Sequence, residues 1–384
     1  MKRRRAGLKF AGLTALAVAG SSLIPLQWVS AEVVVQTRVD EVCGPAAGPQ
    51  VRNFAFPATH VAVHWDGNPE ADVNVSFSTD GKSFGQFVAA ERDEVGEQRR
   101  DARTYRAVLS VDNALAVTVD TDRGIGRLCV LAMADGERKV ERRLAPAGSP
   151  ARGAAPQPDI KARSYWGADE SLRFKKGTNT EIWPPEYHVV EKLLVHHTAT
   201  KNRDRDPKAT IRSMYRYHAV TQGWGDIGYN FMIDEAGTVY KGRHSHDPDV
   251  VGTKTTPDRI TGDDAARKGV RAGHAYGFNA GTVGVALLGT LTNQDATASA
   301  KDSLVNFLAW EASIRVQKDG YTLDPLGKSN YVSPVDNSYY KNDLPNIAGH
   351  LDVNSTECPG ASFYSGLETI RQRVAAIAPR SSVG

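Results

Sequence analysis

The sequence has little cysteine, no long apolar run after its first thirty residues and no large excess of one charge. Three cysteines are present among 384 residues, so one thiol remains after any pairing. Without a later apolar segment of about 20 residues, we expect no transmembrane helix downstream of the N-terminus. A His-Glu-x-x-His motif is also missing, which argues against a zinc protease of that class.

Residues 1–31 have the features of an export signal. Arg3, Arg4 and Arg5 precede an apolar stretch over 8–26, and Val29-Ser30-Ala31 offers small residues for cleavage. The order Arg4-Arg5-Ala6-Gly7-Leu8-Lys9 resembles a twin-arginine signal. An ordinary secretory signal and an uncleaved anchor are the alternatives. We expect a secreted, cell-wall-associated protein that has no membrane contact once the signal is removed.

The charge of the mature chain is nearly balanced. Removing residues 1–31 lowers the basic residues from 47 to 42, against 44 acidic residues. A chain with this balance has no broad basic surface, so we expect no nucleic-acid partner. We expect a monomer.

The chain divides into an export signal, two domains and a linker. Alternating apolar residues, among them Val61, Val63 and Trp65, predict a β-sandwich-like domain over 32–145. Residues 146–163 are rich in Pro, Ala and Gly and predict an extended linker. Cys43 and Cys129 both lie in the β-rich domain, so we predict that they form a disulfide in an oxidising compartment.

Residues 164–380 combine strand and helix patterns, which predicts an α/β domain with a sheet flanked by helices. The predicted strands are 193–195, a hairpin over 231–240, and a central strand over 283–288. The predicted helices are 210–219, 299–317 and 363–376.

Two histidines and the third cysteine could form a metal site in this domain. His196 ends a predicted strand, and Cys358 follows His350 by eight residues. Two imidazoles and one thiolate form a three-ligand set that leaves a fourth zinc position for water. By spacing alone, a free buried thiol and two ordinary histidines remain an alternative.

Five motifs occur in order around these residues. They are 195–200 (VHHTAT), 223–231 (GWGDIGYNF), 239–243 (VYKGR), 273–279 (GHAYGFN) and 349–360 (GHLDVNSTECPG). Together they resemble the peptidoglycan recognition protein family and the related type-2 N-acetylmuramoyl-L-alanine amidases. The resemblance covers about residues 164–378. It implies a mixed central sheet flanked by helices and a peptidoglycan or muropeptide substrate.

The resemblance also assigns roles to single residues. It makes His196, His350 and Cys358 the ligands of Zn²⁺, and Tyr229 the catalytic tyrosine. Thr356 stands where the family's amidases carry Thr or Lys. His197 is expected to be structural, and Asp352 either accepts from His350 or is a solvated loop residue.

Three departures from the family pattern stand out. About thirty residues separate Arg243 from Gly273, and Leu351 replaces a common arginine. Ala286 and Leu288 stand where another amidase branch has a glutamate base. This favours a site that uses Tyr229 and Thr356, and it leaves the identity of the proton acceptor undecided.

The function implied is a zinc-dependent amidase that cuts the bond between muramic acid and L-Ala. A peptidoglycan-binding protein without catalysis is the alternative, and Cys358 and Tyr229 favour catalysis. A cysteine nucleophile with His350 as its base is a third possibility, which chelator sensitivity would separate.

A preference for stems with diaminopimelate is also implied, by Gly223-Trp224 and by Arg243, whose guanidinium can hold a carboxylate with two hydrogen bonds. The alternative is that Trp224 is a core aromatic and Arg243 a surface charge. The remaining groove residues implied by the family are His218, His274, Tyr276 and Asn279.

Overall fold

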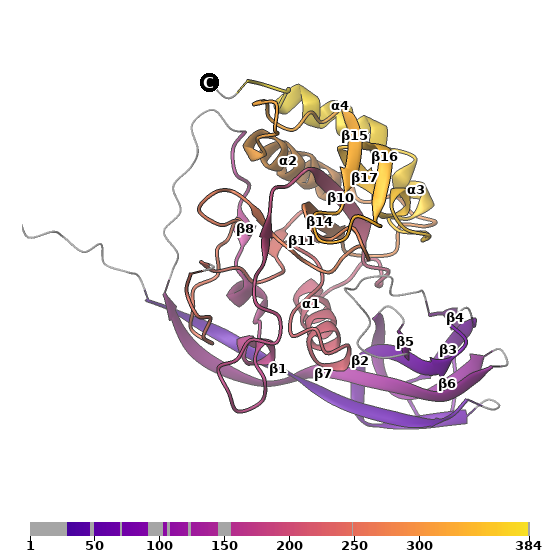
Figure 1. The fold of residues 1–384 in the computed structure, drawn as a ribbon. Helices are drawn as coiled ribbons and strands as arrows, with labels where there is room; N and C mark the ends of the chain where they lie inside the picture. The colour runs from indigo at the N-terminus through magenta and orange to yellow at the C-terminus, as the bar shows by residue number, and fades with distance from the viewer. Residues whose placement is uncertain are drawn as a thin grey trace, which may run out of the picture.

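The computed structural model describes residues 29–46, 50–69, 71–90, 103–105, 108–121, 124–144, 155–247 and 249–382. They form a β-rich N-terminal domain and an α/β C-terminal domain, stacked one on the other (Figure 1). Residues 1–28 of the expected export signal lie outside this range, and Val29, Ser30 and Ala31 are the first residues of strand β1. No helix in the described part of the chain is long and apolar enough to cross a membrane.

Seven antiparallel strands make up the N-terminal domain. They join in one sheet in the order β1-β7-β2-β6-β3-β4, with β5 also paired to β2. This confirms a separate β-rich domain, with its strands hydrogen-bonded into a single sheet. The strands are β1 (Val29–Pro45), β2 (Gln50–Gly67), β3 (Val73–Ser78), β4 (Val88–Ala89), β5 (Arg103–Tyr105), β6 (Leu109–Thr121) and β7 (Ile125–Leu144).

The predicted disulfide joins β1 to β7. Cys43 lies directly opposite Cys129 in the antiparallel register, and the two form the bond. Cys358 is the free cysteine and is buried.

A six-stranded mixed sheet forms the centre of the C-terminal domain, in the order β17-β10-β14-β11-β12-β8. All its pairings are parallel except that between β11 and β12. Its strands are β8 (Ile160–Lys161), β10 (Lys192–His197), β11 (Phe231–Ile233), β12 (Val239–Lys241), β14 (Thr282–Leu287) and β17 (Ile347–Gly349). The short strands β9 (Tyr187–His188) and β13 (Gly269–Val270) pair with each other outside it.

Helices cover one face of this sheet. Val195, Val285 and Ile347 share a core with α2 (Ala298–Ile314) and α4 (Leu367–Ile377). Thr297 accepts a hydrogen bond from the amide of Ala300 and so caps the start of α2. The short α3 (Ala361–Tyr364) precedes α4.

The other face has two separate covers. Over β14, β11 and β12 lie α1 (Pro207–Arg216) and the π-helical turn η3 (Tyr217–Thr221), packed in a core with Ala286 and Met232. Over β10 and β17 lie the loop of Phe278 and the hairpin of β15 (Lys328–Val332) and β16 (Tyr340–Pro345). The strip of sheet between the two covers is where the candidate site lies.

The structure differs from the sequence prediction in the second half of the expected linker, 146–163. Ile160 and Lys161 form β8, which pairs with β12, and Arg163 is fully buried. The amide of Ala155 donates to Ser313 Oγ on α2. The C-terminal domain therefore begins at or before Ala155; residues 146–154 lie outside the described range.

The two domains share a buried interface. Ala62, Leu131 and Met133, on one face of the N-terminal sheet, belong to the same apolar core as Ile211 and Met214 of α1. Val61 and Val63, on the opposite face, belong to the core of the N-terminal domain itself. Both faces of β2 are therefore buried, one within its own domain and one against α1.

Candidate metal centre

His196 reaches the candidate site because β10 alternates between the two faces of the sheet. Leu193 and Val195 point into the helix-covered core, whereas Leu194 packs under the hairpin cover. His196 follows the register of Leu194 and is fully buried between the two covers.

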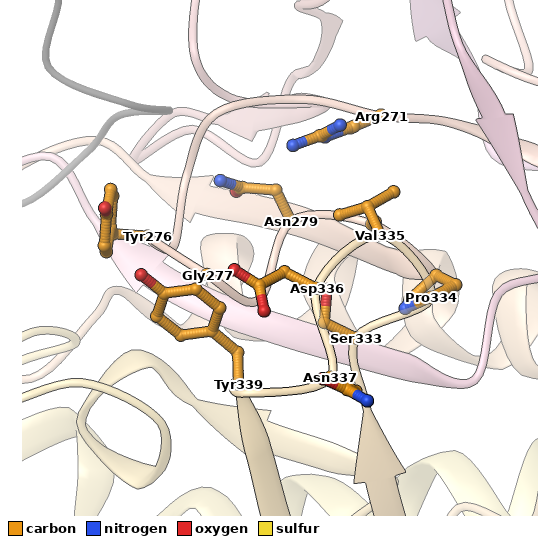
Figure 2. A pocket seen from close by; sticks show the side chains of 11 residues that line it. Arg271, Tyr276, Gly277, Asn279, Ser333, Pro334, Val335, Asp336, Asn337 and Tyr339 are labelled. Carbon is orange, nitrogen blue, oxygen red and sulfur yellow. The ribbon is translucent and has the colours of Figure 1, made fainter.

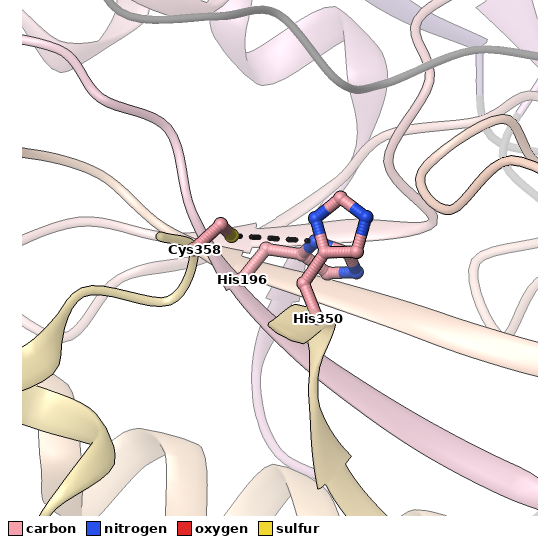
Figure 3. A group of neighbouring side chains, drawn as sticks. All are labelled: His196, His350 and Cys358. Atoms are coloured by element: carbon pink, nitrogen blue, oxygen red, sulfur yellow. Dashed lines mark hydrogen bonds between the residues drawn. The ribbon is translucent and has the colours of Figure 1, made fainter. Parts of the chain in front are cut away.

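His350 and Cys358 complete a cluster around His196. His350 begins a 3-10 turn, η4 (His350–Asp352), directly after β17, which is the parallel neighbour of β10. One ligand atom from each of the three residues lies within 4.8 Å of the others (Figure 3). Cys358 Sγ is 3.6 Å from His196 Nδ1.

His196 and His350 each have a side-chain partner at the Nε2 atom. His196 Nε2 is 3.0 Å from His274 Nδ1, and His350 Nε2 is 3.1 Å from Asn354 Oδ1. These contacts fix both rings and leave the Nδ1 atoms as the ligand atoms. A hydrogen bond to the second ring nitrogen is the usual arrangement behind a metal-bound histidine.

Burial sets the protonation state of the cluster. It lowers the pKa of His196 well below its usual value, that of His350 to about 4 and that of His274 to about 3. All three rings are therefore neutral near pH 7, which is the form that binds a metal. The Cys358 sulfur lies 3.3 Å from the amide nitrogen of His197, which donates to it, and 3.7 Å from the carbonyl of the same residue.

The donor set fits zinc. Two neutral imidazoles and one thiolate are zinc ligands, and three protein ligands leave a fourth position open. A second group of metal-binding residue types, Glu41, His64 and Cys129, is different, because the sulfur of Cys129 is already in the disulfide. Among the described residues, the first group is therefore the one suited to a metal.

Tyr229 and Thr356 lie beside this cluster. The Tyr229 ring is buried, with its centre 5.7 Å from that of His196. Thr356 is half-buried, and its Oγ1 accepts a hydrogen bond from the amide of Cys358 at 2.9 Å. Thr356 thus also holds the loop that carries Cys358.

The family model for N-acetylmuramoyl-L-alanine amidase matches residues 186–361. Human N-acetylmuramoyl-L-alanine amidase is 30% identical over 172 residues, which are 45% of this chain and 22% of the human protein. Peptidoglycan-recognition protein SA of Drosophila melanogaster is 28% identical over 219 residues, covering 56% of this chain and 80% of the relative. The C-terminal domain belongs to the peptidoglycan recognition protein and type-2 amidase family.

Solved structures also match this amidase-family domain. The structure of Drosophila peptidoglycan recognition protein SA is 22% identical and covers 55% of this chain and 91% of its own, with a TM-score of 0.36. An endolysin amidase from Clostridium intestinale is 21% identical and covers 58% and 98%, with a TM-score of 0.34. The chain spans only about a fifth of the human relative's length.

The histidine expected to line the substrate groove, His274, lies behind the metal cluster instead. It is fully buried, and its Nε2 is 3.3 Å from Thr282 Oγ1, which donates to the carbonyl of Phe278. A side chain at Gly284 would collide with the His274 ring, with a Cβ only 2.3 Å from it. His274 is therefore placed to orient His196.

His218 and Trp224 lie together beside Tyr229. Their rings stack 4.8 Å apart, tilted by 30°, and His218 Nδ1 accepts from the amide of Gly228. Gly223, with a φ of 74°, makes the turn between them, and no atom lies close to a Cβ built there. The His218 ring centre is 6.2 Å from that of Tyr229.

Arg243 is neither a free groove cation nor a surface charge. It is buried, and its guanidinium donates to Asp226 Oδ2 at 2.8 Å and to the carbonyl of Trp183 at 2.7 Å. Further bonds go to the carbonyls of Pro184 and Arg271. These four hydrogen bonds hold the buried guanidinium inside the protein, so it does not lie at the surface as a cation for a ligand carboxylate.

Four other residues that the sequence analysis singled out take defined places. His197 Nδ1 accepts from the amide of Leu291, which agrees with a structural role. Tyr276 is exposed, whereas Asn279 is buried and its Oδ1 accepts from the amides of His274 and Ala275. Asp352 fits neither of the two roles expected for it, as an acceptor for His350 or as a solvated loop residue. Its carboxylate accepts hydrogen bonds from the amide of Gly349 and the hydroxyl of Tyr364.

Asn354 is a site residue that the sequence reasoning missed. It joins His350 to the loop of Tyr276, because its Nδ2 donates to the Tyr276 carbonyl at 3.1 Å. Its position four residues after His350, a predicted metal ligand, was the available signal.

Proposed function

We propose that this chain is a zinc-dependent peptidoglycan amidase that hydrolyses the amide between the lactyl group of muramic acid and L-Ala. The observation that carries the proposal is the buried cluster of His196, His350 and Cys358 inside an amidase-family domain, with Tyr229 beside it. The family's binding proteins without activity typically lack the cysteine, so Cys358 supports catalysis over binding alone.

The protein's residues support hydrolysis in distinct ways. Zinc would supply Lewis acidity, which polarises the scissile carbonyl and makes water a stronger nucleophile. His196, His350 and Cys358 would hold the ion, and His274 and Asn354 orient the two rings. The hydroxyl of Tyr229 is suited to donate to the oxyanion that develops on the carbonyl. Thr356 is suited to assist from the opposite loop.

The experiment is digestion of a defined muropeptide by the mature protein, with and without a chelator, with products identified by mass. We expect a free lactyl carboxylate and a free L-Ala amine, and loss of both products after zinc is removed. Binding without cleavage would favour the recognition function, and chelator-resistant cleavage would favour Cys358 as a nucleophile.

The Cys358→Ser variant tests the ligand assignment. We expect elemental analysis to find less than stoichiometric zinc in the variant, because a serine hydroxyl is a much poorer zinc ligand than a cysteine thiolate. Stoichiometric zinc and full activity in the variant would contradict the assignment.

We also propose that the protein is exported and prefers diaminopimelate-type stems. The Cys43–Cys129 disulfide supports an oxidising compartment. The support for the stem preference is the resemblance: Gly223 and Trp224 stand where the family's members that prefer such stems carry Gly-Trp, and Trp224 stacks on His218 beside Tyr229. Comparing kcat/KM on two muropeptides that differ only in the carboxylate of the third stem residue tests it, and a preference for lysine would contradict it.

A further inference from the structure

The β15–β16 hairpin lies on one side of the cluster of His196, His350 and Cys358 and is anchored to the central sheet. Tyr331 and Leu344 anchor it in an apolar core with Phe278, and the Tyr331 hydroxyl donates to the carbonyl of Ala280. The buried ammonium of Lys192 donates to the carbonyls of Ser329 and Leu344. Lys192, on β10, therefore joins both hairpin strands to the central sheet.

A cavity of about 700 Å³ separates the tip of this hairpin from the loop that follows β13 (Figure 2). The hairpin contributes Ser333 and the exposed tip residues Asp336 and Asn337. The facing segment contributes Arg271 and Tyr276. The cavity is thus bounded by two anchored elements.

The lining is polar and suited to hydroxyl and acetamido groups. Asp336 and Asn337 offer carboxylate and amide groups, and Arg271 offers a guanidinium. The Ser333 hydroxyl is buried at the edge of this lining, beside the hydroxyl of Tyr331. Tyr276 and Tyr339 present rings 5.5 Å apart and edge to face. The aromatic rings can pack against the apolar face of a sugar, and the polar side chains can form hydrogen bonds with its hydroxyl groups.

The cavity is coupled to the metal cluster through one side chain. Asn354 bonds to His350 on one side and to the carbonyl of Tyr276, a cavity residue, on the other. The cavity is therefore next to the cluster on the side that the hairpin covers. His218 and Trp224 lie on the other side, which α1 and η3 cover.

The direction of the substrate follows from these two sides. The scissile amide joins a sugar to a peptide, so the two parts leave the metal in different directions. The stem is expected on the side of Trp224, which leaves the hairpin side for the sugar chain. This step rests on the proposed amidase function.

We propose that the hairpin cavity binds a sugar of the glycan strand next to the muramic acid whose stem is cut. It makes the enzyme selective for polymeric wall or long glycan fragments over muropeptides with a single sugar. Asp336, Asn337 and Ser333 hydrogen-bond to this neighbouring sugar, and Tyr339 contacts its face.

The test compares two substrates with the same stem, one with a single muramic acid and one with an oligosaccharide strand. We expect a higher kcat/KM on the longer glycan. In Asp336→Asn the advantage should fall about tenfold, because a sugar hydroxyl loses its charged acceptor, and in Asn337→Ala by about threefold to tenfold, because a neutral hydrogen bond is lost. The rate on the single-sugar substrate should not change. Asn at 336 keeps the Oδ1 acceptor for the amide of Ser338, so the turn is preserved.

Asp343→Asn is the matched control. It makes the same charge change on β16, outside the cavity lining, and Asn tolerates its φ of 53°. We expect this variant to keep the full advantage on the long glycan. Equal kcat/KM of the wild type on both substrates, or an equal loss on both in the cavity variants, would overturn the proposal.

A second measurement separates this proposal from the amidase function. Calorimetric titration with a peptide-free glycan oligosaccharide should show binding to the wild-type protein and weaker binding to Asp336→Asn. If the protein binds this glycan but cleaves neither substrate, the amidase proposal fails and the glycan site stands. If it cleaves both without binding peptide-free glycan, or if a sugar-free stem peptide binds in an Asp336-dependent way, the glycan site is wrong.

Discussion

At the scale of single residues, the candidate site depends on neutral, fixed imidazoles. Burial keeps the pKa of His350 near 4, so no proton competes for its ligand nitrogen near pH 7. The five motifs predicted that His196, His350 and Cys358 lie together and that Tyr229 lies beside them. They could not separate groove residues from residues behind the metal, because motif position does not show which way His274 or Arg243 points.

The first prediction at this scale concerns His274. His274→Ala removes the partner of His196 Nε2, and we expect zinc affinity to fall about 10- to 100-fold. His274→Asn can still place an acceptor oxygen near His196 Nε2, so we expect partial recovery. Competition with a chromogenic chelator measures the affinity directly. Unchanged affinity in the Ala variant would mean that His274 is only a packing residue.

The second concerns Tyr229. Tyr229→Phe removes the hydroxyl and keeps the ring that packs beside His196. We expect kcat to fall about 10²–10³-fold, the usual cost of losing one oxyanion donor, with zinc content unchanged. Single-turnover kinetics on a soluble muropeptide measures it. A wild-type rate would remove Tyr229 from the chemistry.

At the scale of elements, four of the six strands of the C-terminal sheet were predictable because buried strands are apolar runs, whereas β17, with three residues, was not predicted. β10, β14 and the β11–β12 hairpin occur where the pattern predicts. β8 was not predicted, since it has two residues within a segment rich in Pro and Ala. The β15–β16 hairpin was missed as well, because most of its side chains are exposed and polar.

The third prediction concerns the buried ion network that joins these elements. Arg243 and Arg163 both bond to Asp226, and Arg163 also bonds to Glu170. Arg243→Ala leaves a fully buried carboxylate with one cation fewer, so we expect unfolding to become easier by about 3–5 kcal/mol. Activity per folded molecule should fall equally on both stem types, because Arg243 is buried and its guanidinium is bonded to Asp226 and to backbone carbonyls rather than facing a stem carboxylate.

Denaturant unfolding measures this stability change. Arg373→Ala is the matched control, since Arg373 pairs with Asp302 on the exposed surface; such pairs contribute about 1 kcal/mol or less. A stable Arg243→Ala protein that loses activity only on diaminopimelate stems would show that Arg243 leaves its network to contact the substrate.

At the scale of the whole molecule, the two domains behave as one packed unit. Besides the shared apolar core, Arg212 of α1 holds Asp135 of β7 with two hydrogen bonds, at 2.8 and 2.6 Å. The sequence could not predict this interface, because alternation shows which strand positions are buried and not what covers them. Since α1 leads into the turn of His218, we infer that the N-terminal domain supports one edge of the site.

The last prediction is a pH dependence of this interface, which His60 provides. His60 is buried in β2, with Nε2 2.8 Å from Thr210 Oγ1 on α1. Burial lowers its pKa from 6.5 to about 4, against the opposing effect of Asp204, Asp135 and Asp206; Arg212 lowers it further. Above pH 6.5 the ring is neutral in both the folded and the unfolded chain, so it adds no pH dependence there.

Between pH 6.5 and 4 the unfolded chain takes up a proton on His60 that the folded protein excludes, so stability falls as the pH falls. The effect amounts to about 2 kcal/mol at pH 5. His60→Gln cannot titrate and can still bond to Thr210. We therefore expect the free energy of unfolding of the wild type, relative to this variant, to drop by that amount between pH 7 and pH 5, with both proteins in the same metal state. A difference that stays constant over this range would mean that the interface tolerates a charged His60, and that the two domains are held less tightly than the shared core indicates.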